Sequence, residues 1–288
     1  MPNHDRSTVD GSTQLIEQSV QSYAKHHETY DGNHPEIFNE IEQARLRDSL
    51  RRLVSEAEVA QPRALDLGAG SGNVTAHLLD LGARVTAAEV SPHFIGLLQQ
   101  RFGDAVETVH INGVDLEGLP ASTFDLVTLY SVLHHIPDYL AIVDEIARVL
   151  RPGGLVYFDH EVNEEYWRPD GGWAEFRRAA DEHRRLQGGL WNPHRRRWQR
   201  LLIPRNYSRA LHHRRDPEYM MRREGDIHVT PDDHIEWPKL AERVQATGMS
   251  VVRSVDYLNY NADYPIEVWE RFRDRGCTNM RYLVARRD

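Results

Sequence analysis

The sequence predicts an α/β fold built on a doubly wound, mostly parallel sheet. Short apolar segments alternate with amphipathic ones between residues 61 and 161. A glycine-rich turn follows the first apolar segment, and acidic residues recur where later apolar segments end. Apolar strands that alternate with helices are typical of a parallel sheet covered on both faces.

Length and composition predict one large core with an appendage. The chain has 288 residues, of which 40% are hydrophobic, and its single cysteine, Cys277, excludes an internal disulfide. It has no apolar run of about 18 residues that could span a membrane. The polar N-terminus lacks the apolar stretch of a secretory signal. We therefore expect a cytoplasmic protein without a membrane segment, whose oligomeric state stays open.

The elements follow in order along the chain. A short helix is expected near residues 15–30 and a second one from Pro35, a residue suited to a first helical turn. Alternation then predicts strands over 63–70, 84–91, 108–115, 124–133 and 155–161, with helices over 73–82, 92–103 and 138–154. After an irregular stretch, Thr230 and Pro231 predict the start of a helix, followed by strands over 249–258 and 280–286.

The glycine loop LDLGAGSGN lies between the first strand and the next helix. Its glycines, Gly68, Gly70 and Gly72, allow a tight turn and a close approach of the backbone to a ligand. Three acids lie at the ends of successive strands, where ligands bind in such sheets: Asp66, Glu89 and Asp115. These carboxylates suit a cationic amino-acid group, a ribose and an adenine amino group, respectively. A dinucleotide-binding dehydrogenase is disfavoured, because Asn73 occupies the last position of its glycine fingerprint.

Four stretches together resemble a known family: ALDLGAGSGNVTAHLLDLGARVTAAEVS, VDLEGLP, FDLVTLYSVLHHIPD and LRPGGLVYFDH. They resemble the successive motifs of the class I S-adenosylmethionine-dependent methyltransferases, in the small-molecule branch that includes quinone-biosynthesis and sugar methyltransferases. The resemblance covers residues 63–161 and, more loosely, 232–287. It implies a Rossmann-like sheet of seven strands with an antiparallel last strand, and S-adenosyl-L-methionine as the cofactor.

The resemblance also assigns residues to the cofactor. It implies that the glycine loop meets the methionine part, Glu89 the ribose, and Asp115 the adenine. A glutamate replaces the aspartate that the family usually has at position 89. The predicted cofactor-binding residues are Tyr23, Asp66, Gly68, Gly70, Gly72, Glu89, Val90, Asp115, Leu116, Tyr130 and Ser131.

This interpretation divides the chain into four predicted parts. Residues 1–60 form an N-terminal helical lid, and residues 61–161 form the cofactor-binding core. Residues 162–231 form a substrate-recognition insertion after the fifth strand, and residues 232–288 complete the core sheet.

Catalytic candidates follow the fourth and fifth strands. His135 is the candidate general base, with His134 as its alternative and Asp159 as the carboxylate that orients the imidazole. The competing interpretation is that these histidines only cap the next helix.

Metal binding is not expected. Asp226, His228, Asp232, Asp233 and His234 are possible ligands in EGDIHVTPDDHIEW. They match no recognised ligand spacing, and a helix start explains most of the acids.

An arginine-rich stretch, residues 192–215, lies within the insertion. It carries eight arginines in a chain whose net charge is −9. A solvated face paired with acids, a site for a small anion or acidic carrier, and a nucleic-acid surface all remain open. We expect methyl transfer to a small molecule, by O-methylation in secondary or specialised metabolism, with an anionic or carrier-bound acceptor as one possibility. The alternatives are an RNA methyltransferase and a cofactor-binding protein without turnover.

Overall fold

The computed structural model describes residues 34–186 and 226–288, together with Ile16 and Val20. Its centre is a seven-stranded sheet of order β3-β2-β1-β4-β5-β9-β8. All strands are parallel except β9, which runs antiparallel to both of its neighbours. The strands are β1 (Arg63–Leu67), β2 (Arg84–Glu89), β3 (Val106–His110), β4 (Phe124–Tyr130), β5 (Leu150–Val162), β8 (Met249–Tyr257) and β9 (Met280–Arg287). The predicted doubly wound sheet with its antiparallel last strand is confirmed.

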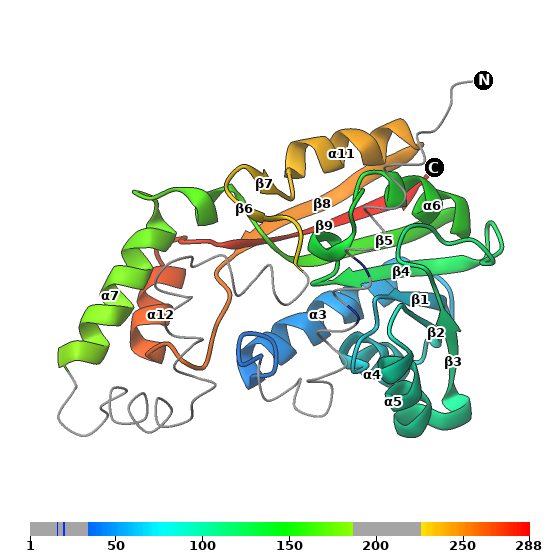
Figure 1. Ribbon diagram of the computed structural model, residues 1–288, viewed down its shortest axis with the longest axis horizontal. Helices are drawn as coiled ribbons and strands as arrows, with labels where there is room; N and C mark the ends of the chain where they lie inside the picture. Colours follow the sequence, from blue (N-terminus) through cyan, green and yellow to red (C-terminus); the bar gives the residue numbers. More distant parts are fainter. Residues whose placement is uncertain (1–15, 17–19, 21–33, 187–225) are drawn as a thin grey trace.

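Helices cover both faces of this sheet (Figure 1). One face carries α3 (Glu40–Glu56), α4 (Asn73–Asp80) and α5 (Pro92–Phe102). The other face carries α6 (Ala141–Val149) and α11 (Trp237–Ala246). Strand side chains alternate between the two layers, so that Leu155 and Tyr157 pack toward α3 while Val156 and Phe158 pack toward α6. Apolar side chains are buried on both faces of the central strands, which specifies the register of these strands.

The end of β5 departs from this alternation. The pairing of β5 with β9 shifts register between Phe158 and Glu161, and His160 adopts a positive φ of 62°. An inserted residue of this kind re-aims the side chains that follow it. Asp159 and Glu161 therefore point to different surroundings, although a regular strand would place both on one face.

A smaller apolar cluster lies at one end of the sheet, where α7 (Gly172–Leu186) packs against α12 (Ile266–Arg273) (Figure 1). It is formed by buried Trp173, Phe176, Ala180, Leu258, Val268, Trp269 and Phe272. The first part of the predicted insertion is thus anchored on the C-terminal part of the chain. The short turn η4 (Glu164–Trp167) leads into α7, and the two-stranded ribbon β6 (Val229–Thr230) with β7 (Asp233–His234) precedes α11.

Two predicted helix starts were wrong. Helix α3 begins at Glu40 instead of Pro35, because the side chain of Asn39 accepts a hydrogen bond from the backbone N–H of Glu42 and caps the helix there. Helix α11 begins at Trp237 instead of Pro231, because the residues around Pro231 form the turn of the β6–β7 ribbon. Within the described residues, no helix is long and apolar enough to cross a membrane.

Candidate active site

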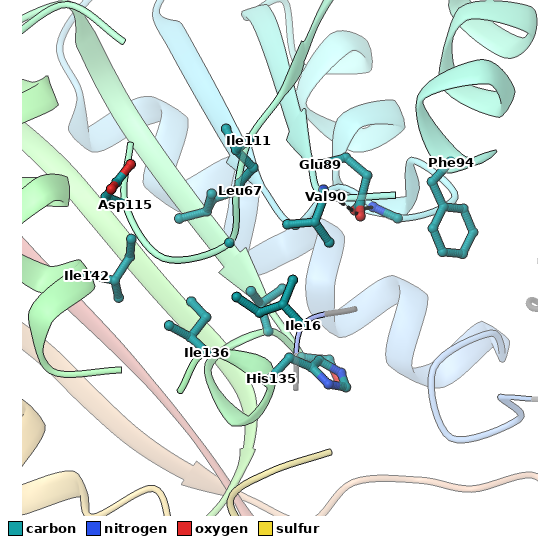
Figure 2. Close-up of a pocket in the computed structure, with 15 residues that line it drawn as sticks. Ile16, Leu67, Glu89, Val90, Phe94, Ile111, Asp115, His135, Ile136 and Ile142 are labelled. Atoms are coloured by element: carbon teal, nitrogen blue, oxygen red, sulfur yellow. Dashed lines mark hydrogen bonds between the residues drawn. The ribbon is translucent and has the colours of Figure 1, made fainter. Parts of the chain in front are cut away.

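A pocket opens at the carboxyl ends of β1, β2 and β4, where the sequence places the glycine loop (Figure 2). Its empty space is about 800 Å³, including the open solvent at its mouth. Seven predicted site residues line it: Gly68, Gly70, Glu89, Val90, Asp115, Ser131 and His135. The structure thus brings residues from three strand ends and two loops to one cavity.

The glycine loop approaches the pocket with two of its three glycines. Gly68 and Gly70 both have positive φ and line the cavity. A Cβ atom on Gly68 would come within 2.6 Å of the side chain of Val132, so the close fit there needs glycine. Gly72 does not line the pocket. A Cβ atom there would lie 2.5 Å from the ring of Phe102, so Gly72 serves the packing of α4 against α5.

Glu89 ends β2 with its carboxylate in the pocket wall, and only 5% of the residue is exposed. Its oxygens accept hydrogen bonds from the backbone N–H groups of Gly70, Val90 and Ser91, each at 2.9 Å. Burial raises the pKa of Glu89, and the three N–H donors oppose that rise. A carboxylate held in this way can accept from the hydroxyls of a ligand without moving.

Asp115 lies at the far end of the same cavity. It does not close β3 as predicted, because β3 ends at His110 and Asp115 follows in the loop. The side-chain amide of Asn112 donates to Asp115 Oδ1 at 2.9 Å and holds this loop. The other lining residues are mostly apolar: Ile16, Leu67, Val90, Phe94, Ile111, Gly113, Val132, Ile136 and Ile142. Figure 2 shows Leu67 and Ile111 between the two acids.

Besides Gly72, three further predicted cofactor residues lie away from the pocket. Asp66 is buried behind the loop, where its oxygens accept from the hydroxyls of Thr75 and Thr128 at 2.6 and 3.1 Å. Burial raises its pKa to about 6. Leu116 is fully buried in the core, and the ring of Tyr130 packs toward α3. Strand alternation explains why the side chain of Tyr130 points away from the pocket, because the neighbouring Ser131 faces the pocket instead. Tyr23 lies outside the described residues.

His134 and His135 form the 3₁₀ turn η3 (Leu133–His135) directly after β4. His134 Nδ1 lies 2.8 Å from Glu161 Oε2, and the other oxygen of Glu161 accepts from the backbone N–H groups of Val132 and Leu133. Burial alone would lower the pKa of His134, but Glu161 and Asp226 raise it to about 9. His134 is therefore a cation at neutral pH, held by a carboxylate that the sequence did not single out.

His135 faces the pocket, and its Nδ1 lies 3.5 Å from Asp226 Oδ1. Asp226 also lies 4.0 Å from His134 Nε2, and burial raises the pKa of its carboxyl. The two imidazole rings are adjacent but tilted by 45° to each other, with centroids 4.1 Å apart. The turn after β4 and the segment entering β6 thus supply one polar corner beside the cavity.

Asp159 does not belong to this corner, so its predicted pairing with His134 or His135 was wrong. Its carboxylate faces α3, where Arg45 donates to it from two guanidinium nitrogens at 3.1 Å each. Tyr257 donates its hydroxyl at 2.9 Å, and Tyr157 donates as well. The bulge at His160 separates Asp159 from Glu161, and Glu161 takes the place beside the histidine.

Comparisons with known proteins agree with the fold. Residues 65–158 match the family model described as "Methyltransferase domain". A ubiquinone biosynthesis O-methyltransferase of Aromatoleum aromaticum is 32% identical over 105 residues, which are 35% of this chain and 45% of that protein. The enzyme of the same name from Xanthomonas campestris pv. campestris is 35% identical over 106 residues, covering 35% and 44%. The chain therefore spans less than half the length of these relatives.

Solved structures share the architecture across more of the chain. The 1,6-didemethyltoxoflavin-N1-methyltransferase of Burkholderia thailandensis superposes with a TM-score of 0.53 at 18% identity, covering 100% of this chain and 92% of that one. A Mesorhizobium loti S-adenosylmethionine-dependent methyltransferase has a TM-score of 0.53 at 16% identity, covering 83% and 96%. At such identities the likeness shows the fold alone. The domain match, the relatives and the strand order together identify residues 65–158 as a class I S-adenosylmethionine-dependent methyltransferase domain.

Proposed function

We propose that the chain transfers a methyl group from S-adenosyl-L-methionine to an oxygen atom of a small-molecule acceptor. The observation that carries this proposal is the pocket itself, which combines a glycine loop, a buried carboxylate at the end of β2 and an apolar slot that leads to Asp115. The O-methyltransferases among the relatives support oxygen as the methylated atom. Membership of secondary or specialised metabolism belongs to the same proposal.

The lining fits the parts of the cofactor in a consistent order. Glu89 would accept from the ribose hydroxyls, and the slot between Ile111 and Ile142 would hold the adenine next to Asp115. The backbone at Gly68 and Gly70 leaves room for the methionine part, because neither residue projects a side chain into the cavity. When bound, the cofactor supplies an activated methyl group, and the protein contributes alignment and exclusion of water.

His135 is the residue placed to act on the acceptor. It lines the pocket, whereas His134 does not and already carries a proton at neutral pH. A hydroxyl acceptor needs to lose its proton as the methyl group arrives, and imidazole is suited to receive it. We infer that His135, held against Asp226, removes this proton, and that Asp159 has no direct part.

The N-terminal and inserted parts complete the pocket in this proposal. Ile16 belongs to the predicted lid of residues 1–60 and already lines the cavity, which supports a lid over the cofactor. Asp226 lies near the end of the predicted insertion and approaches His135. We propose that residues 162–231 shape the acceptor site. The arginine-rich stretch 192–215 lies outside the described residues, so an anionic or carrier-bound acceptor remains part of the proposal.

Cofactor binding tests the first step. Isothermal calorimetry with S-adenosylhomocysteine should show binding that Glu89→Gln weakens by at least about 10-fold, since a hydrogen bond to a charged group contributes roughly 1.5–3 kcal/mol. Glu107→Gln is the matched control, because Glu107 lies on the neighbouring strand β3, outside the pocket, and accepts from Thr86. Equal affinity of the wild type and Glu89→Gln, with both proteins folded by circular dichroism, would refute the proposed site.

Turnover tests the second step. Release of S-adenosylhomocysteine is measured with a panel of phenolic and sugar hydroxyl acceptors between pH 6 and 9. His135→Ala should lower kcat by roughly 100-fold or more, with little change in cofactor affinity. Full turnover of His135→Ala across this range would remove the residue from the reaction. A chain that binds the cofactor and methylates none of the acceptors would favour a binding protein without turnover.

A further inference from the structure

We propose that His134, His135 and Asp226, the His–His–Asp cluster, bind one divalent transition-metal ion beside the cofactor pocket. This site is not apparent from the sequence, because the two histidines and the aspartate are about ninety residues apart. Only the fold brings the turn after β4 against the segment that enters β6.

The donor atoms converge at metal-binding distances. One ligand atom from each residue lies within 4.8 Å of the other two. His135 Nδ1 and Asp226 Oδ1 are 3.5 Å apart, and His134 Nε2 and Asp226 Oδ1 are 4.0 Å apart. Ligands at about 2.0–2.2 Å from a tetrahedral zinc ion lie about 3.4 Å from each other. The cluster therefore needs a closure of at most about 1.4 Å between any two of these atoms to hold an ion.

Glu161 orients His134, one of the three proposed ligands. It contacts His134 Nδ1 at 2.8 Å, which turns Nε2 of the same ring toward Asp226. Glu161 is itself fixed by the backbone N–H groups at the start of η3, and only 4% of the residue is exposed. A carboxylate that holds the far nitrogen of a histidine ligand is the usual outer partner in zinc sites.

The third ligand is held in place by backbone contacts. The N–H groups of Ile227 and His228 both donate to the carbonyl oxygen of His134, at 2.9 and 3.2 Å. His228 Nε2 also lies 3.1 Å from the carbonyl oxygen of Ile136. The residues next to Asp226 are thus tied to the turn that carries both histidines. A site on such a platform keeps its geometry without the ion.

Two imidazoles and one carboxylate are a donor set that suits zinc, iron, cobalt or nickel. Three protein ligands leave at least one position open, as in catalytic zinc sites. On binding, the ion takes the place of the proton on His134 Nε2, which passes to solvent. Because His135 lines the pocket, the open position faces the space next to the cofactor.

The chemical class of the acceptor follows if the proposed methyl transfer is also correct. In the metal-loaded chain the ion would bind an oxygen of the acceptor and favour loss of its proton to solvent. His135 would then hold the ion, in place of the proton removal proposed above for the metal-free chain. The preferred acceptors would then be hydroxyl compounds that present a second oxygen to the ion, such as catechols or α-hydroxy acids. Metal binding itself does not depend on this step.

Metal titration tests the site on the full chain. Protein stripped with a chelator should bind one equivalent of Zn²⁺ by calorimetry, and Co²⁺ should give the visible absorption of a four- or five-coordinate ion. His135→Ala and Asp226→Ala should each weaken binding by more than about 100-fold. Glu161→Gln, which keeps an oxygen for the backbone donors, should weaken it by about 10- to 100-fold.

His77→Ala is the matched control, because this buried histidine of α4 contacts Gln43 away from the cluster. It should leave both the stoichiometry and the cobalt spectrum unchanged. Absence of a stoichiometric ion in the wild type, or a cobalt spectrum retained by His135→Ala, would overturn the proposal. S-adenosylhomocysteine affinity is measured on the same preparations, so that loss of the metal site and loss of the cofactor site are distinguishable. Variants that unfold are recognised by circular dichroism and replaced by Asp226→Asn.

Discussion

Arg45 of α3 is the charged group whose removal should most affect the stability of the fold. It donates to Asp159 from two nitrogens at 3.1 Å and to Glu42 at 2.8 Å, and its guanidinium lies 3.9 Å from the centre of the Tyr257 ring. Arg45→Met keeps much of the volume and the helix propensity while it removes the charge. The carboxylate of Asp159 would then remain buried without its cation.

The size of the loss in stability depends on the hydrogen-bond donors that remain around Asp159, whose side chain is 0% exposed. Removing one partner of a buried ion pair costs about 3–5 kcal/mol. Asp159 keeps the hydroxyls of Tyr157 and Tyr257 and the N–H of His160 as donors, which favours the lower end. We expect Arg45→Met to lower the free energy of unfolding by about 3 kcal/mol, which is roughly 6–12 °C in Tm for a domain of this size.

Urea unfolding followed by circular dichroism measures this difference, with Arg51→Met as the matched control. Arg51 lies on the same helix and pairs with Asp48, but the two side chains are 58% and 72% exposed. An exposed pair of this kind contributes at most about 1 kcal/mol. The two variants therefore separate the effect of burial from the effect of losing an arginine.

The double variant Arg45→Met/Asp159→Asn completes the test. It removes both charges together and should recover at least about 1 kcal/mol relative to the sum of the single changes, because the residues are in direct contact. Equal stabilities of Arg45→Met and Arg51→Met would refute the argument. Additive single changes would also refute it, because Asp159 would then not depend on Arg45.

Two further predictions concern the glycine loop. The free energy of unfolding of Asp66→Asn should increase by about 3 kcal/mol relative to that of the wild type between pH 4 and 7. The pKa of Asp66 rises on folding to about 6, so that the stabilising contribution of Asp66 is present below about pH 4 and is lost as pH rises through 6. Unfolding at several pH values measures this change, and a difference that is constant with pH would contradict the prediction. Gly72→Ala should lower the free energy of unfolding by about 1–3 kcal/mol more than Gly82→Ala does. Both glycines have positive φ, but only at Gly72 would a Cβ atom press against Phe102. Equal changes in Tm for the two variants would exclude that contact.

Much of the core was predictable because its patterns are local. The apolar strand before Gly68 and the glycines after it predict β1 and the turn without reference to the rest of the chain. The acid at the end of β2 was placed correctly for the same reason, since Glu89 directly follows an apolar run. Side-chain alternation also decides which residues face the pocket, and of the two predicted neighbours it places Ser131 in the pocket wall and Tyr130 on the opposite face.

The packing partners were not predictable, because they are set by contacts far apart in the sequence. Gly72 belongs to the same motif as Gly68, yet its neighbour is Phe102, thirty residues further along. Asp115 lines the pocket from a loop and not from the end of a strand. The apolar walls, such as Ile111 and Ile142, look like ordinary core residues in the sequence. Only the arrangement of the elements shows that they enclose a cavity.

The exchange of Asp159 for Glu161 shows how one backbone irregularity decides chemistry. Both acids lie in the stretch FDHE, and period-two alternation would place them on the same face of β5. The register shift after Phe158 and the positive φ of His160 turn them apart. Asp159 then stabilises the α3 side through Arg45, while Glu161 orients His134 at the pocket. A regular strand would therefore assign the histidine-orienting carboxylate to Asp159, which instead pairs with Arg45.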